Sequence, residues 1–312
     1  MKPLLIAITF DTDNDLYLDH RSSDVTWKGI DEAPRLADTL RQYKDSAGES
    51  AKLTWFLRCD GQLERLHSSR LWLVDEYAND WKRFVAAGDE LAWHPHLAKR
   101  PGTEWVPEKD EDAIIDDLRT TASAIQAHAW FHPFTVRLGW GVSSARILTE
   151  LSQLGMIADS SAIPGRHELA LPLKDWRGTP LRPYVPSVKD YRLPASPGAR
   201  ALPIVELPAT TTLLKLPAEQ QSKYRQLNLS YRPELLARPI RELVATEDVL
   251  VLVSHCYEFS DRLAPRTPNP LIAFSYDALR QNMDALVAAC HEHHRPFFFK
   301  TAQQLAEAFP HE

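Results

Sequence analysis

The chain has 312 residues, of which 44% are hydrophobic and 25% are charged, and its formal net charge at pH 7 is -6. This length and composition fit one large α/β domain, and we expect a single domain over residues 1–312. Acidic and basic residues are interspersed, which excludes the basic stripe that follows a nucleic-acid backbone. No run approaches the roughly 20 apolar residues that cross a bilayer, so no membrane span is expected.

The amino terminus and the cysteines both favour a cytoplasmic protein. The apolar run 4–8 is too short for the hydrophobic region of a secretion signal, and acidic residues follow it directly. The three cysteines, Cys59, Cys256 and Cys290, are far apart in the sequence and show no CxxC spacing. This pattern argues against a disulfide framework or a cysteine zinc site and is typical of a reducing compartment.

Short apolar runs alternate with amphipathic stretches along most of the chain. The runs predicted as buried strands are 4–10, 53–57, 90–93, 135–138, 204–207, 249–254 and 296–299. Between most of them, apolar residues recur at spacings of three and four, which predicts helices at 31–43, 74–87, 112–127, 144–154 and 276–291. Alternating strands and helices indicate a parallel sheet, in a βα barrel or a doubly wound fold.

The segment from about 163 to 232 departs from this alternation. It holds close to half of the chain's 23 prolines and shows little periodicity before residue 204. Loops of this length inside a compact domain are usually functional, so we interpret the segment as a loop-rich insertion that forms a lid or a specificity wall. Its aromatic residues Trp176, Tyr184 and Tyr191 favour an ordered segment over a flexible one.

Acidic residues follow the first predicted strand, where Asp11 and Asp13 come directly after an apolar run. In barrel folds, the carboxyl ends of the strands carry the catalytic groups. Residues two apart in an extended segment point to the same side, so these carboxylates can share one site, in which one binds a metal ion and the other takes a proton. For either aspartate alone, capping a turn is the alternative role.

Two histidines follow the third predicted strand, in the segment Trp93-His94-Pro95-His96. Imidazoles at positions i and i+2 of an extended segment can converge on one ion, and the proline between them restricts the backbone. A lone histidine is more often a core or surface residue. A pair of histidines after one strand, with a pair of aspartates after an earlier strand, favours a metal site.

Together, these segments resemble the NodB-homology domain of the polysaccharide deacetylases, carbohydrate esterase family four. The first motif of that family, Thr-Phe-Asp-Asp, is matched by the segment from Thr9 to Asp13 with one residue inserted. The resemblance implies that Asp11 is the catalytic base and Asp13 a metal ligand, and that His94 and His96 are the histidine ligands. The family usually has these histidines four apart, whereas here they are two apart.

Later segments resemble the remaining motifs of the family in the same order. Arg137, on the fourth predicted strand, matches the arginine that pairs with the base and orients it. In the turn that follows, Gly139 and Gly141 would let backbone N–H groups approach an oxyanion. Trp93 and Trp140 adjoin the expected site and are candidates to line the substrate groove, together with these two glycines.

Two more residues complete the series of motifs. Asp159 matches the fourth motif, beside the groove, where it could support a histidine or Arg137; capping a turn is its alternative role. His255 ends the apolar run 249–254 and matches the fifth motif, in which the histidine is the general acid that protonates the leaving amine. The alternative for His255 is a buried histidine bonded to a carbonyl.

The resemblance covers most of the chain and implies a distorted (β/α)7-type barrel, similar to a TIM barrel, with a long proline-rich loop insertion. It also implies a hydrolase that uses a divalent metal ion, with zinc the expected one. The substrate implied is an N-acylated sugar or glycan precursor, from which an N-acyl group, expected to be acetyl, leaves as acetate and frees an amine.

Two alternatives stay open from the sequence. The same site could hydrolyse a non-sugar amide, such as a ureido, polyamine-like or lipid-linked acyl compound. The chain could also be a catalytically silent barrel that binds glycans, although a binding module needs neither the base Asp11 nor the acid His255. An amidohydrolase-type barrel is disfavoured, because its HxH pair usually follows the first strand, which here carries the aspartates.

Overall fold

The computed structural model describes residues 2–15, 25–102, 104–265 and 269–309. The chain divides into two compact units. Unit 1 comprises Met1–Leu53 and Ala209–Thr301, and unit 2 comprises Thr54–Pro208 and Ala302–Glu312. The single domain expected over residues 1–312 stays a prediction.

Unit 1 is built on parallel strands that are buried on both faces. β1 (Leu4–Asp11) pairs in parallel with β11 (Val249–His255) and with β12 (Phe297–Phe299). Nearly every residue of β1 and β11 is buried, which explains why both read as continuous apolar runs in the sequence. The register sets Asp11 opposite His255, so both side chains lie at the same end of the sheet.

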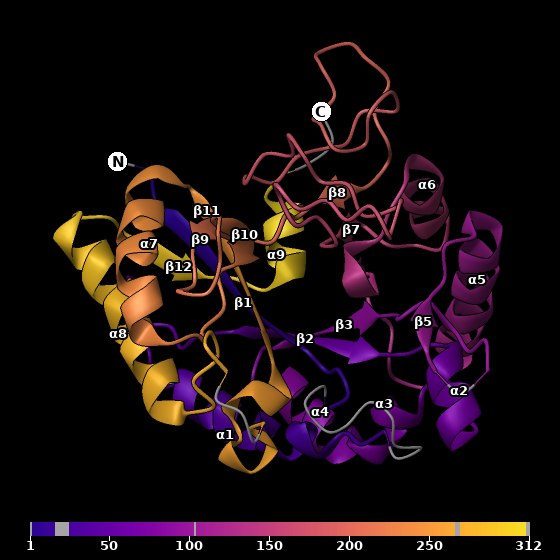
Figure 1. The fold of residues 1–312 in the computed structure, drawn as a ribbon, viewed down its shortest axis with the longest axis horizontal. Helices are drawn as coiled ribbons and strands as arrows, with labels where there is room; N and C mark the ends of the chain where they lie inside the picture. Colours follow the sequence, from indigo (N-terminus) through magenta and orange to yellow (C-terminus); the bar gives the residue numbers. More distant parts are fainter. Residues whose placement is uncertain (1, 16–24, 103, 266–268, 310–312) are drawn as a thin grey trace. The chain divides into compact units, whose positions relative to one another are not determined.

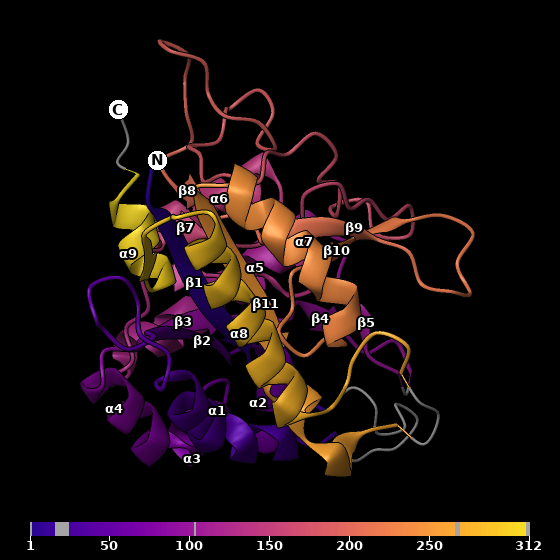
Figure 2. The ribbon, with the colours of Figure 1, turned by 90° about the vertical axis from the view of Figure 1, so that its left-hand side faces the viewer.

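Helices cover one face of this strand pair. α7 (Pro233–Thr246) and α8 (Tyr276–Glu292) pack against each other beside β1 and β11 (Figures 1 and 2). Ser275 caps α8, because its side chain accepts a hydrogen bond from the N–H of Asp277. The other elements of unit 1 are η1 (Lys28–Glu32), α1 (Ala33–Leu40), the antiparallel hairpin β9 (Thr211–Leu214) and β10 (Lys223–Gln226), η3 (Cys256–Phe259) and η4 (Asp261–Leu263).

Unit 2 contains a series of parallel strands whose carboxyl ends lie opposite one another at the same edge of the sheet. Their order is β2 (Leu53–Arg58), β3 (Glu90–His94), β6 (Thr135–Val136), β7 (Ala158–Asp159) and β8 (Val205–Glu206). In the register, Trp93 lies opposite Val136, Val136 opposite Asp159, and Asp159 opposite Glu206. The residues that follow β3, β6, β7 and β8 therefore lie in one row.

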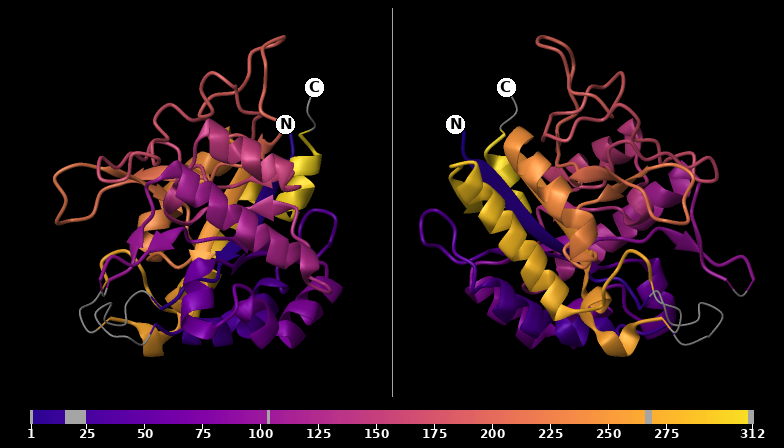
Figure 3. Two further views of the ribbon diagram at one scale, coloured as in Figure 1. Left: turned by 90° about the vertical axis from the view of Figure 1, so that its right-hand side faces the viewer. Right: turned by 60° about the vertical axis from the view of Figure 1, so that its left-hand side comes forward.

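Two helices of unit 2 match helices predicted from the sequence. α5 (Glu111–Ala127) and α6 (Ala145–Gln153) lie side by side (Figure 3). The helix predicted at 74–87 is two helices, because Tyr77 has a non-helical backbone conformation. The elements of unit 2 that complete it are α2 (Gly61–His67), α3 (Trp72–Glu76), α4 (Ala78–Ala86), the hairpin β4 (Ala98–Lys99) and β5 (Val106–Pro107), η2 (Gly139–Gly141) and α9 (Ala302–Glu307). Across the described residues, none of the helices combines the length and the apolar character needed to cross a membrane.

The irregular part of the expected insertion is residues 163–204, and β8, β9 and β10 occupy later positions of the predicted range 163–232. This irregular part is the rose-coloured coil near α6 and β8 in Figure 1. Trp176 anchors it, since its ring is fully buried and its Nε1 donates to the carbonyl of Gly141 at 2.7 Å. The hydroxyl of Tyr184 donates to the carbonyl of Tyr191 at 3.1 Å. Aromatic side chains therefore order this segment, as expected.

Candidate active site

In unit 1, Asp13 and His255 meet where β1 and β11 end. Asp11 is the last residue of β1 and lies opposite His255 in the register. The backbone after Asp11 brings Asp13 to this histidine, with 3.5 Å between His255 Nε2 and Asp13 Oδ2. Both aspartates are buried, whereas 19% of the His255 side chain is exposed. The expected base, one expected metal ligand and the expected general acid thus share one end of this sheet.

Asp15, the third aspartate of the same segment, has a structural role. It accepts hydrogen bonds from Thr26 Oγ1 at 2.6 Å and from the backbone N–H groups of Lys28 and Gly29, each at 2.9 Å. These bonds fix the start of η1 against the end of β1. Turn capping was the alternative role considered for Asp11 and Asp13. In the structure, Asp15 has this role.

Glu258 orients His255, and the sequence analysis missed it. Glu258 Oε1 lies 3.0 Å from His255 Nδ1, and Oε2 accepts the backbone N–H of His255 at 3.0 Å. Asn228 Nδ2 and Ser230 Oγ donate to the same Oε2 at 2.8 and 2.9 Å, so this buried carboxylate is well satisfied. With Nδ1 held by Glu258, the Nε2 side of the imidazole faces Asp13. The capping-box spacing of three residues between His255 and Glu258 was a signal in the sequence.

The carboxylates around His255 favour its charged form. Burial lowers the pKa of His255, but Glu258, Asp13 and Asp11 outweigh burial and raise the pKa to about 9. At this pKa the imidazole carries a proton at neutral pH, which suits a group that donates one.

In unit 2, the imidazoles of His94 and His96 face each other. Their Nε2 atoms are 3.1 Å apart, and His94 Nδ1 lies 2.6 Å from the carbonyl oxygen of Arg137. Because a carbonyl only accepts, Nδ1 of His94 carries the proton, which leaves the lone pair on its Nε2. Two nitrogen ligands of a tetrahedral zinc ion, each about 2.0–2.1 Å from the metal, lie roughly 3.3 Å apart. The spacing and the tautomer of this pair therefore fit a divalent ion.

A fully buried ion pair holds the backbone of His96. Asp60 Oδ2 accepts the N–H of His96 at 3.0 Å and Arg58 Nε at 2.7 Å, and neither Arg58 nor Asp60 is exposed to solvent. Asp60 Oδ1 accepts the N–H groups of Gln62 and Leu63, which caps α2. Burial raises the pKa of Asp60, but Arg58 and His96 outweigh it and lower the pKa, so Asp60 is ionised.

The backbone N–H groups of Gly139 and Gly141 have acceptors within the protein, so their expected role at an oxyanion is wrong. The N–H of Gly139 donates to the carbonyl of Pro95 at 2.9 Å, and that of Gly141 donates to the carbonyl of Leu138 at 3.2 Å. Both glycines are buried rather than part of a groove. Gly139 instead provides space, because a Cβ at this position would lie 2.1 Å from Cδ2 of His96.

We expect Gly139→Ala to weaken zinc binding about 10–100-fold, because the added methyl group must displace the His96 imidazole. Isothermal titration with zinc measures this change. Gly155→Ala is the control, since Gly155 has open space around its Cβ position and a φ of +93°. That variant loses stability through backbone strain alone and keeps the wild-type zinc affinity. Equal zinc affinities of the Gly139→Ala variant and the wild type would contradict the placement of His96.

The two tryptophans expected in the groove have different roles. Trp93 is fully buried and its Nε1 donates to the carbonyl of Cys59 at 2.9 Å, so its prediction as a groove residue is wrong. Trp140 is partly exposed, and its ring centroid lies 4.6 Å from that of His96. Its backbone is left-handed, with φ at 59°, and its N–H has no acceptor among the residues that the structure describes. Trp140 is therefore the residue of this turn whose N–H can donate to an oxyanion.

Arg137 is held at the end of β6 by its neighbours in unit 2. Its Nε donates to the carbonyl of Ser160 at 3.1 Å, and its Nη2 donates to the hydroxyl of Ser160 at 3.0 Å. The guanidinium carbon lies 3.9 Å from the centroid of the Phe56 ring, an arrangement that favours a cation. The pairing of Arg137 with Asp11 stays a prediction.

Asp159 belongs to a buried carboxyl pair and not to a groove. It lies opposite Glu206 on the neighbouring parallel strand, and neither side chain is exposed. Ser161 Oγ donates to Asp159, and the N–H of Ala162 donates to Glu206 at 3.0 Å. Burial raises the pKa of both carboxyls, most strongly that of Glu206, and Arg137 opposes the effect. The expectation that Asp159 lines the groove is wrong, and Glu206 is a partner that the sequence analysis missed.

This carboxyl pair predicts a pH dependence of stability. The folded-state pKa of Glu206 lies above the unfolded value of about 4.3, so the unfolded chain releases the proton first as the pH rises. The unfolded state then binds fewer protons, and the free energy of unfolding falls with rising pH. We expect Glu206→Gln to gain stability relative to the wild type as the pH is raised from 4 to 8, measured by urea denaturation. A stability difference that stays constant over this range would contradict the raised pKa.

The whole chain was compared with known proteins. No protein-family model matches it, and no curated protein matches it. Similar solved structures include a protein assigned as a glycoside hydrolase/deacetylase from Parabacteroides distasonis, with a TM-score of 0.58, 15% sequence identity, and coverage of 98% of this chain and 69% of that chain. A protein assigned as a polysaccharide deacetylase from Mycobacterium smegmatis has a TM-score of 0.55 and 18% identity over 98% of this chain and 90% of that chain.

A third similar structure has another activity. It is a 4-alpha-glucanotransferase from Thermococcus litoralis, with a TM-score of 0.50 and 11% identity, and the match covers 99% of this chain and 41% of that chain. At these identities the likeness is one of fold, and a fold by itself does not fix the reaction. The chain has the distorted (β/α)7-type barrel fold of the polysaccharide deacetylases, as the sequence predicted.

Proposed function

We propose that this protein is a metal-dependent deacetylase that hydrolyses the N-acetyl amide of an amino sugar, releasing acetate and a free amine. The observation that carries the proposal is the pair of imidazoles with Nε2 atoms 3.1 Å apart, at the end of β3. The tautomer of His94, set by the carbonyl of Arg137, supports the same role. The shared fold with proteins assigned as polysaccharide deacetylases makes a sugar amide the first substrate to test.

We assign His94 and His96 as ligands of the ion, and the motif series adds Asp13 as the carboxylate ligand, with zinc the expected metal. Two imidazoles and one carboxylate are a typical catalytic set, which leaves a position open for water or substrate. When bound, the ion supplies Lewis-acid polarisation of the amide carbonyl and lowers the pKa of a water molecule.

The roles of the other residues follow from their positions and from the motif series. Asp11, two residues before the proposed ligand Asp13 in the chain, takes the proton of the attacking water. By the motif series, Arg137 pairs with this carboxylate and orients it. The N–H of Trp140 donates to the oxyanion, and His255, held by Glu258, protonates the amine as the C–N bond breaks.

The test is a substrate comparison with the zinc-loaded protein. N-acetylglucosamine and N,N′-diacetylchitobiose are assayed beside N-acetylputrescine and a ureido compound, and released acetate or amine is measured. We expect hydrolysis of the sugar amides to exceed that of the non-sugar amides by about 100-fold in kcat/KM. If a non-sugar amide is hydrolysed faster, a non-sugar amide replaces the sugar amide as the proposed substrate. If the protein binds the sugars without hydrolysing them, it is a silent glycan-binding barrel.

A further inference from the structure

His96 lies beyond the end of its strand, so strand pairing does not hold it. β3 ends at His94, whose partner in the register is Arg58 at the end of β2. Pro95 follows and has no N–H with which to continue the ladder. The Nε2 atom of His96 nevertheless lies 3.1 Å from that of His94. Contacts other than strand pairing must set this spacing.

The peptide group between Pro95 and His96 is held at both of its polar atoms. The carbonyl of Pro95 accepts the N–H of Gly139 at 2.9 Å, and the N–H of His96 donates to Asp60 Oδ2 at 3.0 Å. A peptide group is planar, so a hydrogen bond at each of these atoms fixes the orientation of the plane. The Cα atom of His96 lies in this plane. The two bonds therefore set where the His96 side chain begins.

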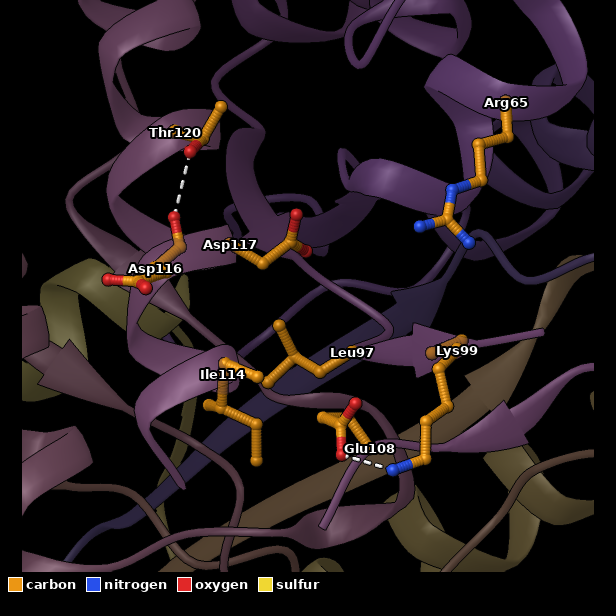
Figure 4. A pocket seen from close by; sticks show the side chains of 10 residues that line it. Arg65, Leu97, Lys99, Glu108, Ile114, Asp116, Asp117 and Thr120 are labelled. Atoms are coloured by element: carbon orange, nitrogen blue, oxygen red, sulfur yellow. Dashed lines mark hydrogen bonds and ion pairs between the residues drawn. The ribbon is translucent and has the colours of Figure 1, made fainter. Parts of the chain in front are cut away.

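The residue after His96 is anchored as well. The carbonyl of Leu97 accepts the N–H of Glu108 at 2.7 Å. The side chain of Leu97 is buried and, together with the buried Ile114 of α5, lines a cavity of about 280 Å³ (Figure 4). The backbone is thus held both before and after His96.

Asp60 differs from the other groups around His96, because it is charged and fully buried. Its Oδ2 also accepts Arg58 Nε at 2.7 Å, and Arg58 Nη2 donates to Gln62 Oε1 at 2.6 Å. Neither side chain of this ion pair is exposed. Hydrogen bonds to a charged group are roughly twice as strong as neutral ones. A buried ion pair is often no more stable than two apolar side chains of the same size, so stability alone does not account for it.

We propose that Asp60, held by Arg58, is a positioning residue that sets the metal affinity of the site through the N–H of His96. The carboxylate keeps His96 at the spacing from His94 that an ion requires, so little conformational freedom is lost when the ion binds. The motif series includes neither Arg58 nor Asp60. The inference rests on the proposed function in taking His94 and His96 as metal ligands, and it is independent of the substrate.

Asp60→Asn tests this role, because asparagine has one acceptor oxygen where the carboxylate has two. Asp60 Oδ1 accepts the N–H groups of Gln62 and Leu63, so a single oxygen cannot serve both α2 and His96. We expect the zinc affinity, measured by isothermal titration, to fall about 10–100-fold. Urea denaturation of the metal-free protein measures the stability of the same variant.

Two further variants separate positioning from stability. Asp60→Asn leaves the charge of Arg58 buried and unpaired, and the double variant Arg58→Met/Asp60→Asn removes that charge and should recover stability. Its zinc affinity should stay about 10–100-fold reduced, because the N–H of His96 still lacks its carboxylate acceptor. Thr54→Val, on the same strand, removes a buried hydrogen bond of 3.1 Å to Glu90. This control should lose stability and keep the wild-type zinc affinity.

The outcomes separate this inference from the proposed function. Wild-type zinc affinity in a folded Asp60→Asn variant overturns the inference and leaves the metal site intact. Zinc affinity that recovers together with stability in the double variant also overturns it, because Asp60 would then act through stability alone. If neither Asp60 variant folds, hydrogen exchange of the His96 amide in the metal-free wild type decides. Slow exchange supports the inference, and exchange at the rate of an exposed loop overturns it.

Zinc binding by the wild type is the reference for all of these results. A wild type that binds no zinc overturns the proposed function and this inference together. An inference that fails alone is therefore recognised by a wild type that binds zinc.

Discussion

Replacing Asp11 by asparagine is expected to lower kcat by about 10²–10⁴-fold while zinc remains bound. Asparagine has nearly the same shape as aspartate but takes no proton, so the attacking water keeps its proton. Asp11 ends β1 and is buried, which makes an isosteric change the least disruptive one at this position. Steady-state kinetics and metal analysis of the same preparation measure the two properties together.

The matched comparison for this variant is Asp13→Asn, two residues along the chain. Because Asp13 is a proposed ligand, the Asp13→Asn variant should lose both zinc affinity and activity. The Asp11→Asn variant should lose activity alone. An Asp11→Asn variant that turns over substrate at the wild-type rate would remove Asp11 from the role of base. Loss of zinc from Asp11→Asn would instead make it a ligand.

The second large effect is expected for His255→Gln on substrates with poor leaving groups. Turnover of an N-acetyl sugar should fall by about 10²–10⁴-fold, because an amine leaves only when it is protonated. An aryl ester such as p-nitrophenyl acetate releases a phenolate that needs no proton, so its hydrolysis should fall by less than about tenfold. Comparing the two substrates therefore isolates the acid role from a general loss of structure.

Two further variants define the origin of this effect. His132→Gln changes an exposed histidine and should leave both activities unchanged. Glu258→Gln should show the same substrate difference as His255→Gln but a smaller loss, about 10–100-fold, because the imidazole remains and only its orientation is weakened. Equal losses on the amide and the ester in His255→Gln would show that this histidine does not protonate the leaving group.

The strands were the best predicted part of the fold, and the reason is physical. Strands that are buried on both faces read as continuous apolar runs. This holds, fully or nearly so, for β1, β2, β3, β11 and β12.

α7 was missed because it contains prolines. Pro233 occupies the first turn, where no N–H is needed, and Pro239 lies inside the helix, where a sequence rule predicts an end.

The proposed site was only partly predictable, because several of its residues act through contacts that the fold creates. Glu258, Asp60 and Glu206 each stand beside a predicted residue through a hydrogen bond or strand register. The prediction that Trp93 lines the groove was wrong, and the sequence pattern itself already argued against it. Neighbouring residues in a strand point to opposite faces, so Trp93 and His94 of β3 could not both face the groove.

Metal content is the most direct test of the central claim, that His94 and His96 bind a catalytic metal ion. Elemental analysis of the purified wild type and of His94→Ala and His96→Ala measures it. We predict close to one zinc ion per chain in the wild type and its loss in both variants, because each removes one of only a few ligands. A wild-type protein that binds no divalent metal even after reconstitution would contradict the deacetylase and favour the glycan-binding barrel.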